Sequence, residues 1–164
     1  GAKYILRELG LVFFLAGAGT AAGENLWNVL QMHGFILLFA GTIVTTLPLI
    51  HSKPTFGYLF ENGEKRIAYL TDTKGLPSST QEKLNEFDLD IMIIDCSFAP
   101  GVDKKGHNNL DEVLAISKEL QPKQTVLTHI GHDFDVWLQD NAQDLPVNII
   151  IGRDGMNIFH CDYV

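Results

Sequence analysis

With 164 residues the chain is long enough for one domain with a buried core, and a hydrophobic content of 46% is ordinary for a globular protein. Twelve Lys and Arg against 20 Asp and Glu give a net charge of -8, which argues against nonspecific nucleic-acid binding because such a surface repels a phosphate backbone. The two cysteines, Cys96 and Cys161, lack CxxC spacing and are too few for a disulfide scaffold. We expect both to be buried thiols.

The N-terminal residues combine Lys3 and Arg7 with an apolar run and then small residues, which is the order found in a secretory signal. The apolar run is short and glycine-rich for a membrane-spanning helix, which needs about 20 apolar residues. A buried strand that ends in a Gly-rich turn before Gly23 accounts better for the pattern. We therefore predict a cytoplasmic protein that does not associate with a membrane.

From residue 35 onward, short apolar runs rich in Ile, Val, Thr and aromatic residues alternate with turn signals, a pattern typical of strands. Asn62-Gly63 lies between two of these runs and predicts a β-hairpin. The predicted strands are residues 35–39, 42–47, 56–60, 67–71, 91–96, 125–130 and 147–151.

Three segments with helical signals alternate with the later strands. They are residues 77–87, with Ser78 or Ser79 as the cap, residues 108–120, and residues 133–142. In the second, Asn109 caps the helix and Glu112 closes the capping box. An apolar stripe follows in that helix: Leu110, Val113, Leu114 and Leu120. Hairpins followed by strand–helix alternation predict one α/β layered domain.

Several metal-binding or acid–base side chains fall at the ends of predicted strands. Asp72 follows the run at 67–71, and Asp95 ends the run at 91–94. The carboxyl ends of strands in strand–helix units share one edge of a sheet, so side chains there should converge. The candidate group is His51, Asp72, His107 and His129, with His132 as a further member.

Histidine and carboxylate are the ligands that zinc, manganese and iron use, and an aspartate can bridge two ions. Two bridged ions generate hydroxide at neutral pH and hold a phosphoryl group during in-line attack. Taken singly, each residue has a structural explanation, since an Asp after a strand often caps a turn. His33 and His160 are left in that structural class.

Five sequence strings resemble, in order, the metallo-β-lactamase-fold cyclic phosphodiesterases of the phosphonate-degradation (carbon–phosphorus lyase) pathway. They are "LPLIHSKPTFGYLFENGEKRIAYLTDTKGLP", "IDCSFAP", "GHNNLDEVLAI", "VLTHIGHDFDVWL" and "DGMNI", within residues 35–159. The resemblance implies an α/β, metallo-β-lactamase αββα sandwich, with residues 35–164 as its C-terminal half and 1–34 as a remnant of the N-terminal half. Members of this family hydrolyse 5-phosphoribosyl 1,2-cyclic phosphate.

The resemblance also implies a role for each candidate residue. His51 would bind one metal ion, His129 the other, and Asp72 would bridge them. His107 would contact the substrate phosphate and pass a proton to the leaving group. His132 would be the surviving ligand of a separate structural zinc site.

The sequence departs from the family in its first half. The HxHxDH motif that supplies two ligands to each ion is absent, as is an N-terminal cysteine cluster, and no room for them exists between Gly23 and His33. Either the molecule lacks this stretch, or the stretch belongs to the molecule and not to this sequence. The second explanation is favoured because deleting internal strands exposes apolar edges at a cost above the marginal stability of a domain, about 5 to 15 kcal/mol.

The resemblance thus predicts a dinuclear metal-dependent phosphodiesterase that cleaves a small cyclic phosphate ester by attack of a metal-bridging hydroxide. The cofactors would be two divalent ions, Mn or Zn or Fe, with a structural Zn. The expected partners are a small-molecule phosphate ester and a second copy of the chain in a homodimer. The alternatives are another hydrolase of the same fold (lactonase, thioesterase or nuclease) and a non-catalytic relative that binds a ligand without metal.

Overall fold

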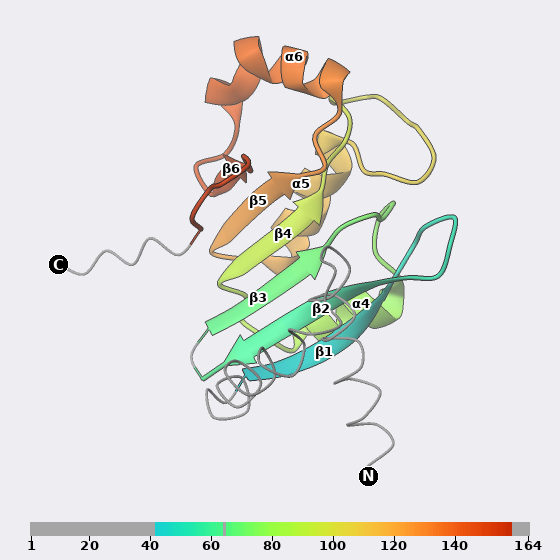
Figure 1. The fold of residues 1–164 in the computed structure, drawn as a ribbon, viewed down its shortest axis with the longest axis vertical. Coiled ribbons are helices and arrows are strands. Elements are labelled where there is room, and N and C mark those ends of the chain that lie inside the picture. Colours follow the sequence, from blue (N-terminus) through green and yellow to red (C-terminus); the bar gives the residue numbers. More distant parts are fainter. Residues whose placement is uncertain (1–41, 64, 159–164) are drawn as a thin grey trace, which may run out of the picture. The chain divides into compact units, whose positions relative to one another are not determined.

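The computed structural model describes residues 42–63 and 65–158, which belong to one compact unit. Figure 1 shows them as a sheet with its helices beside it. The strands are β1 (Thr42–Leu49), β2 (Thr55–Asn62), β3 (Lys65–Leu70), β4 (Ile91–Asp95), β5 (Gln124–Thr128) and β6 (Ile149–Ile151). The helices are α4 (Ser78–Asn85), α5 (Leu110–Leu120), α6 (His132–Asn141) and the short 3-10 helix η2 (Ala142–Asp144).

The six strands lie side by side in the order in which they occur in the sequence. β2 and β3 form an antiparallel hairpin, whereas β3, β4, β5 and β6 pair in parallel. The predicted hairpin is confirmed, but its turn lies one residue later, because Asn62 pairs with Lys65. Gly63 has a φ of 55°, a left-handed conformation that glycine adopts without steric cost.

The core lies between one face of the sheet and the helices. In β3 the side chains of Ala68 and Leu70 are fully buried while Tyr69 between them is 40% exposed, as expected of a strand with one covered face. Helices α4 and α5 lie behind the sheet in Figure 1 and pack against each other. The helical core side chains are Leu84, Leu110, Val113, Leu120, Phe134 and Leu138.

The capping box predicted for α5 is present. The Asn109 side chain accepts a hydrogen bond from the Glu112 backbone N–H at 2.9 Å, and the Glu112 carboxylate accepts one from the Asn109 backbone N–H at 2.9 Å. The predicted cap of α4 is wrong: Pro77 occupies the N-cap, Ser78 begins the helix, and no side chain caps it. The fixed φ of proline suits a helix start and needs no capping hydroxyl.

Some predictions fall on residues outside the described ranges. They concern the strand at 35–39, the N-terminal strand and glycine turn, His33, His160 and Cys161. Cys96 is fully buried as expected, and burial raises the pKa of its thiol, so it stays protonated and unreactive. Within residues 42–63 and 65–158, no helix has the length and apolar character that crossing a membrane requires.

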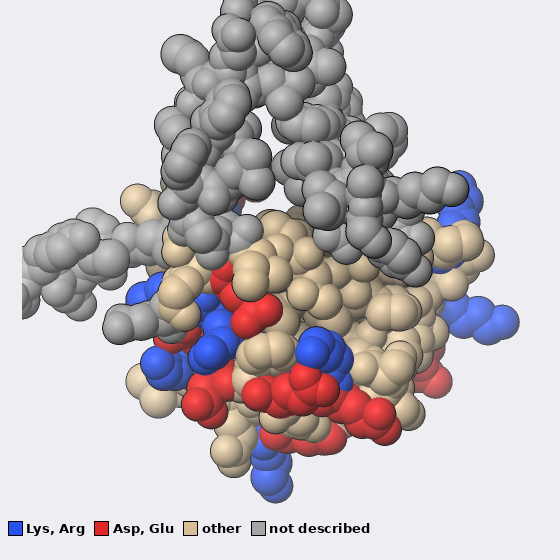
Figure 2. Space-filling model, turned by 90° about the horizontal axis from the view of Figure 1, so that it is seen from below, with Lys and Arg blue, Asp and Glu red and all other residues tan. Residues whose placement is uncertain are grey.

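Charged side chains on the face seen in Figure 2 include both signs. Asp and Glu side chains (red) gather toward one border of the described surface, with Lys and Arg (blue) scattered among them. The described part of this face has no continuous basic area of the kind that binds a phosphate backbone.

Asp90 stabilises the end of the sheet where β4 begins. Its side chain is buried, and it accepts hydrogen bonds from the Lys123 ammonium at 2.8 Å and from the Arg66 backbone N–H at 2.8 Å. Burial alone would raise the pKa of the Asp90 carboxyl, but these hydrogen bonds and the charges of Lys123 and Lys65 outweigh burial and hold this pKa below its usual value. The ionised form is therefore favoured in the folded chain.

We expect Asp90→Asn to lower the free energy of unfolding at neutral pH by about 1 kcal/mol, since the lysine partners are exposed. Because the carboxyl pKa is lower in the folded than in the unfolded chain, this contribution is present above about pH 4 and is lost as the pH falls through the folded value. Urea unfolding at about pH 7 and about pH 3 measures the change. Asp88→Asn, at an exposed position two residues earlier, is the control. A difference between Asp90→Asn and the parent that is the same at both pH values would contradict the prediction.

Candidate metal and acid–base site

The parallel strands bring residues distant in sequence to one edge of the sheet. Asp72 lies two residues after β3, Asp95 is the last residue of β4, and His129 follows directly after β5. The connection that contains His51 reaches the same edge, because β2 runs antiparallel to β3 and starts beside the end of β3. His107 lies in the connection from β4 to α5.

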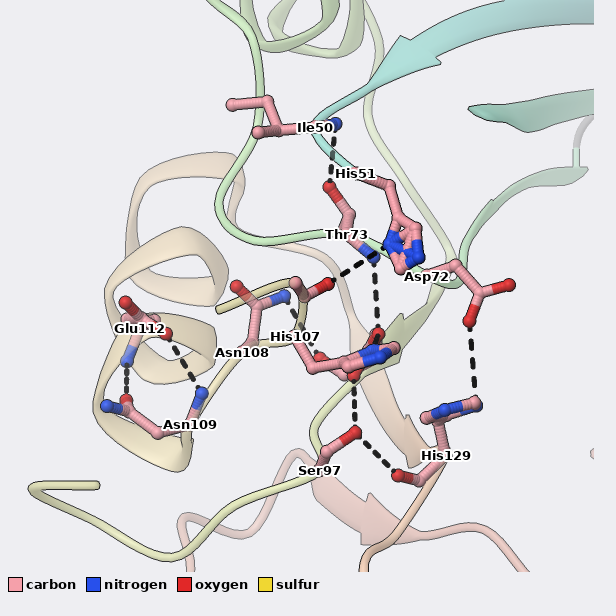
Figure 3. A network of polar contacts seen from close by, with 12 residues as sticks. Ile50, His51, Asp72, Thr73, Ser97, His107, Asn108, Asn109, Glu112 and His129 are labelled. Atoms are coloured by element: carbon pink, nitrogen blue, oxygen red, sulfur yellow. Dashed lines mark hydrogen bonds and ion pairs between the residues drawn. The ribbon is translucent and has the colours of Figure 1, made fainter. Parts of the chain in front are cut away.

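Three of the predicted residues form a compact group of possible metal ligands. One ligand atom each from Asp72, His107 and His129 lies within 4.8 Å of the others. The Nδ1 atom of His129 is 3.8 Å from the nearest Asp72 carboxylate oxygen, and the His107 and His129 rings stack with their centroids 4.7 Å apart. Figure 3 shows these side chains pointing toward a common space.

Both Asp72 and His129 adopt a left-handed backbone conformation, with φ of 57° and 59°. This conformation is uncommon for residues with a Cβ, and such strain persists only where the surrounding structure enforces it. In both cases the chain turns sharply at the strand end and directs the side chain toward the group. Left-handed residues at a strand end are often found at functional sites.

Asp95 is the buried centre of the site. Its carboxylate is fully buried and accepts three hydrogen bonds: from His107 Nδ1 at 2.6 Å, from the Thr73 backbone N–H at 3.2 Å and from the Ser97 hydroxyl at 3.0 Å. An ionised carboxylate can only accept, so His107 carries its hydrogen on Nδ1. The Nε2 atom of His107 is then left for a ligand or a proton transfer.

Asn108 joins the His107 connection to the ends of β3 and β4. Its side chain donates a hydrogen bond to the Asp95 carbonyl at 3.1 Å and accepts one from the Gly75 backbone N–H at 2.7 Å, and the residue is fully buried. A buried side-chain amide satisfied on both sides fixes the segments that it connects. The position of His107 is therefore set by its neighbours on both sides.

Lys74 ties the turn after β3 to the connection that carries His107. Its ammonium contacts the carboxylates of Asp103 at 2.9 Å and Glu112 at 2.8 Å. The hydrogen bonds to Asp103 and to Glu112 raise the pKa of the Lys74 ammonium, and the bond to Lys74 lowers the pKa of the Asp103 carboxyl. Glu112 thereby links the site to the capping box of α5.

His51 lies next to this group. Its ring centroid is 5.2 Å from that of His107, and its Nδ1 atom is 3.4 Å from the Gly106 carbonyl oxygen. His51 is outside the set of three whose ligand atoms lie within 4.8 Å of each other. His132, the proposed structural ligand, is the first residue of α6, is exposed, and also lies outside that set.

The residues present fit a divalent metal ion. One carboxylate oxygen and two imidazole nitrogens are a ligand set for zinc, manganese or iron, and three protein ligands with an open position are typical of a catalytic site. A carboxylate behind a histidine, as Asp95 lies behind His107, is the usual support of a metal-binding imidazole. His107 therefore suits either of two roles, ligand or proton donor.

Two residues of this site, Asp95 and Ser97, were not included in the predicted group. Asp95 offered a signal, because a carboxylate within the apolar run 91–96 must be buried and a buried charge requires partners. Ser97 offered none, since a serine after a strand is common in turns. Only the fold shows that both lie between His107 and His129.

Comparison with known proteins supports this assignment of the fold. A crystal structure of a diphosphatase from the PhnP family is 28% identical, with a TM-score of 0.58, and the similarity covers 81% of this chain and 54% of that one. The metallo-β-lactamase fold protein YhfI of Bacillus subtilis has a TM-score of 0.58 at 24% identity, over 70% of this chain and 48% of that one. This chain therefore spans about half the length of these structures.

A short match of a different kind is also found. Over 49 residues, 30% of this chain, the sequence is 43% identical to an uncharacterized transporter of Bacteroides fragilis, of which the match covers 9%. A match of this length does not assign a family. Residues 8–130, in contrast, match the β-lactamase superfamily domain, which is 123 of the 164 residues. The chain therefore belongs to the β-lactamase superfamily, and the predicted metallo-β-lactamase fold is confirmed.

Proposed function

We propose that this chain forms the acid–base and metal-binding wall of a metal-dependent phosphodiesterase that acts on a small cyclic phosphate ester. The observation that carries the proposal is the convergence of Asp72, His107 and His129 within 4.8 Å, with the buried Asp95 behind His107. The similarity to a PhnP-family diphosphatase over 81% of the chain supports phosphate ester chemistry. The cyclic ester, and a role in phosphonate degradation, rest on the sequence resemblance.

In this proposal Asp72 and His129 hold metal, with His51 as a further ligand beside them. When bound, divalent ions activate water at neutral pH and stabilise negative charge on a phosphoryl group. Both side chains suit this role because about half of each is exposed, 47% for Asp72 and 50% for His129. The number of ions and their identity, Mn, Zn or Fe, are part of the proposal, as is a structural zinc at His132.

His107 would complete the reaction as the proton donor. As water oxygen bonds to phosphorus, the ester P–O bond breaks, and the leaving oxygen takes a proton from His107 Nε2. Asp95 holds Nδ1 of the same ring at 2.6 Å, which fixes the ring and stabilises its positive charge before the proton is transferred. The His107 side chain is 23% exposed, so a substrate can reach it from one side.

The substrate, a homodimeric assembly and a cytoplasmic location remain predictions. Negative charge over the whole chain, -8, favours a small anionic substrate held by metal over a nucleic acid. The homodimer rests on the family resemblance alone. Size-exclusion chromatography with light scattering would measure the assembly.

The direct test is an assay of the metal-depleted protein reloaded with Mn²⁺ or Zn²⁺. We expect hydrolysis of a ribose 1,2-cyclic phosphate that is lost with a chelator and regained with the metal. A lactone and a thioester, assayed in parallel, distinguish other hydrolases of this fold. Metal-dependent turnover of the lactone or thioester but not of the cyclic phosphate would refute the proposed substrate class, and no metal binding would refute the metal site.

A further inference from the structure

We propose that Ser97 is a positioning residue that joins the His107–Asp95 pair to the turn carrying His129. Its hydroxyl lies 3.0 Å from an Asp95 carboxylate oxygen and 2.8 Å from the His129 carbonyl oxygen (Figure 3). The residue is 5% exposed, so water does not compete freely for these contacts. The inference rests on the proposed function, in which His129 binds metal and His107 transfers a proton.

The turn at His129 depends on the segment that contains Ser97. The left-handed conformation of His129 must be held by its surroundings. Besides the hydroxyl contact, the Gly131 backbone N–H donates to the Ser97 carbonyl at 3.2 Å, and the Cys96 backbone N–H donates to the Thr128 carbonyl at 2.9 Å. The end of β4 therefore runs directly against the end of β5 on both sides of His129.

Close packing leaves this turn no freedom to shift toward Ser97. A Cβ atom at Gly131 would lie 2.5 Å from the Ser97 carbonyl oxygen, so only glycine fits there. The two backbones are thus in contact, and the Ser97 hydroxyl bridges the remaining gap to His129. Among the described residues it is the only side-chain donor to the His129 carbonyl.

The hydroxyl also connects the two functions of the site. It has one proton and two acceptors, the Asp95 carboxylate and the His129 carbonyl, so it bridges a charged and a neutral oxygen. The same carboxylate holds His107 and the Thr73 backbone N–H next to Asp72. Removing the hydroxyl leaves the orientation of His129 without its bond to the buried carboxylate, while the Asp95–His107 hydrogen bond remains.

The chain offers a matched control for the substitution. Ser117 is 6% exposed, and its hydroxyl makes one hydrogen bond of 2.9 Å, to Thr125 between α5 and β5. Ser97→Ala and Ser117→Ala therefore remove the same atom from equally buried positions, but Ser117 contacts no residue of the site. Ser97→Thr keeps the hydroxyl at the site.

The experiment measures metal affinity of the full chain by competition with a chelator, using Mn²⁺ and Zn²⁺. We expect Ser97→Ala to weaken affinity about 10-fold, as for other groups that orient a ligand, with Ser97→Thr and Ser117→Ala within about 2-fold of the parent. In parallel, amide hydrogen exchange of the metal-free protein should be faster at residues 129–131 in Ser97→Ala only.

Each outcome decides a separate point. Equal metal affinity and equal exchange at residues 129–131 in Ser97→Ala and Ser117→Ala would overturn the role of Ser97, as would a loss in Ser97→Thr as large as in Ser97→Ala. A parent protein that binds neither ion would refute the proposed function. In that case faster exchange at 129–131 in Ser97→Ala would still support Ser97 as the residue that holds the turn, and unchanged exchange would overturn it.

Discussion

Asp72→Asn is expected to reduce metal affinity strongly and to lower metal-dependent turnover by about 1,000-fold, equivalent to about 4 kcal/mol of transition-state stabilisation. The substitution removes a negative charge and one of two ligand oxygens while preserving side-chain shape. The side chain is 47% exposed, and its contact with His129 is 3.8 Å long. The free energy of unfolding of the metal-free protein should therefore change little. Metal content by mass spectrometry and turnover of a cyclic phosphodiester measure the effect.

Asp140→Asn is the control for this experiment. Asp140 is exposed on α6, so the same change of charge occurs far along the chain from the site. It should leave metal content and turnover as they are in the parent. If Asp72→Asn retains parental metal content and turnover, the Asp72 group does not bind metal, and the proposed function is wrong.

Asp95→Asn is expected to lower turnover by about 100-fold for an ester with a poor leaving group, the range typical of general acid catalysis. The neutral amide can still hydrogen-bond to Ser97 and to the Thr73 backbone, but it no longer stabilises a positive charge on His107. An ester with a nitrophenolate leaving group needs little protonation of the leaving oxygen. Its turnover should fall much less, and the ratio of the two rates reports on the proton transfer.

The other buried aspartate provides the comparison for Asp95. Asp90→Asn also places an amide at a buried carboxylate position, but at the opposite end of the sheet. It should reduce stability and leave the ratio of the two rates unchanged. Equal losses for both esters in Asp95→Asn would instead indicate that Asp95 supports His107 as a metal ligand, the second role that its geometry allows.

Local chemistry made much of the fold predictable. The capping box of α5 needs only Asn109 and Glu112 at the correct spacing, so it was confirmed in detail. The strands were identified from short β-branched runs, although His129 leaves the strand predicted at 125–130 by turning left-handed after Thr128. The serine cap of α4 was wrong because Pro77 can begin a helix without one.

The candidate site was predictable only in outline. Asp72 and His129 follow parallel strands, and the common edge of such strands is a property that the sequence pattern already implies. The grouping of His107 with them, rather than of His51, depends on how the connection from β4 to α5 folds back. That connection is held by Asn108 and Lys74 through contacts with residues about 30 positions away or more.

The sequence by itself determined the class of fold, the order of strands and helices, and the residues able to bind metal, because periodicity, caps and side-chain chemistry are local properties. Only the tertiary structure decided that Asp95 is the buried partner of His107 and that Ser97 connects it to His129. These contacts arise where the ends of neighbouring parallel strands meet. Their distances depend on the packing of the whole sheet, which no short stretch of sequence specifies.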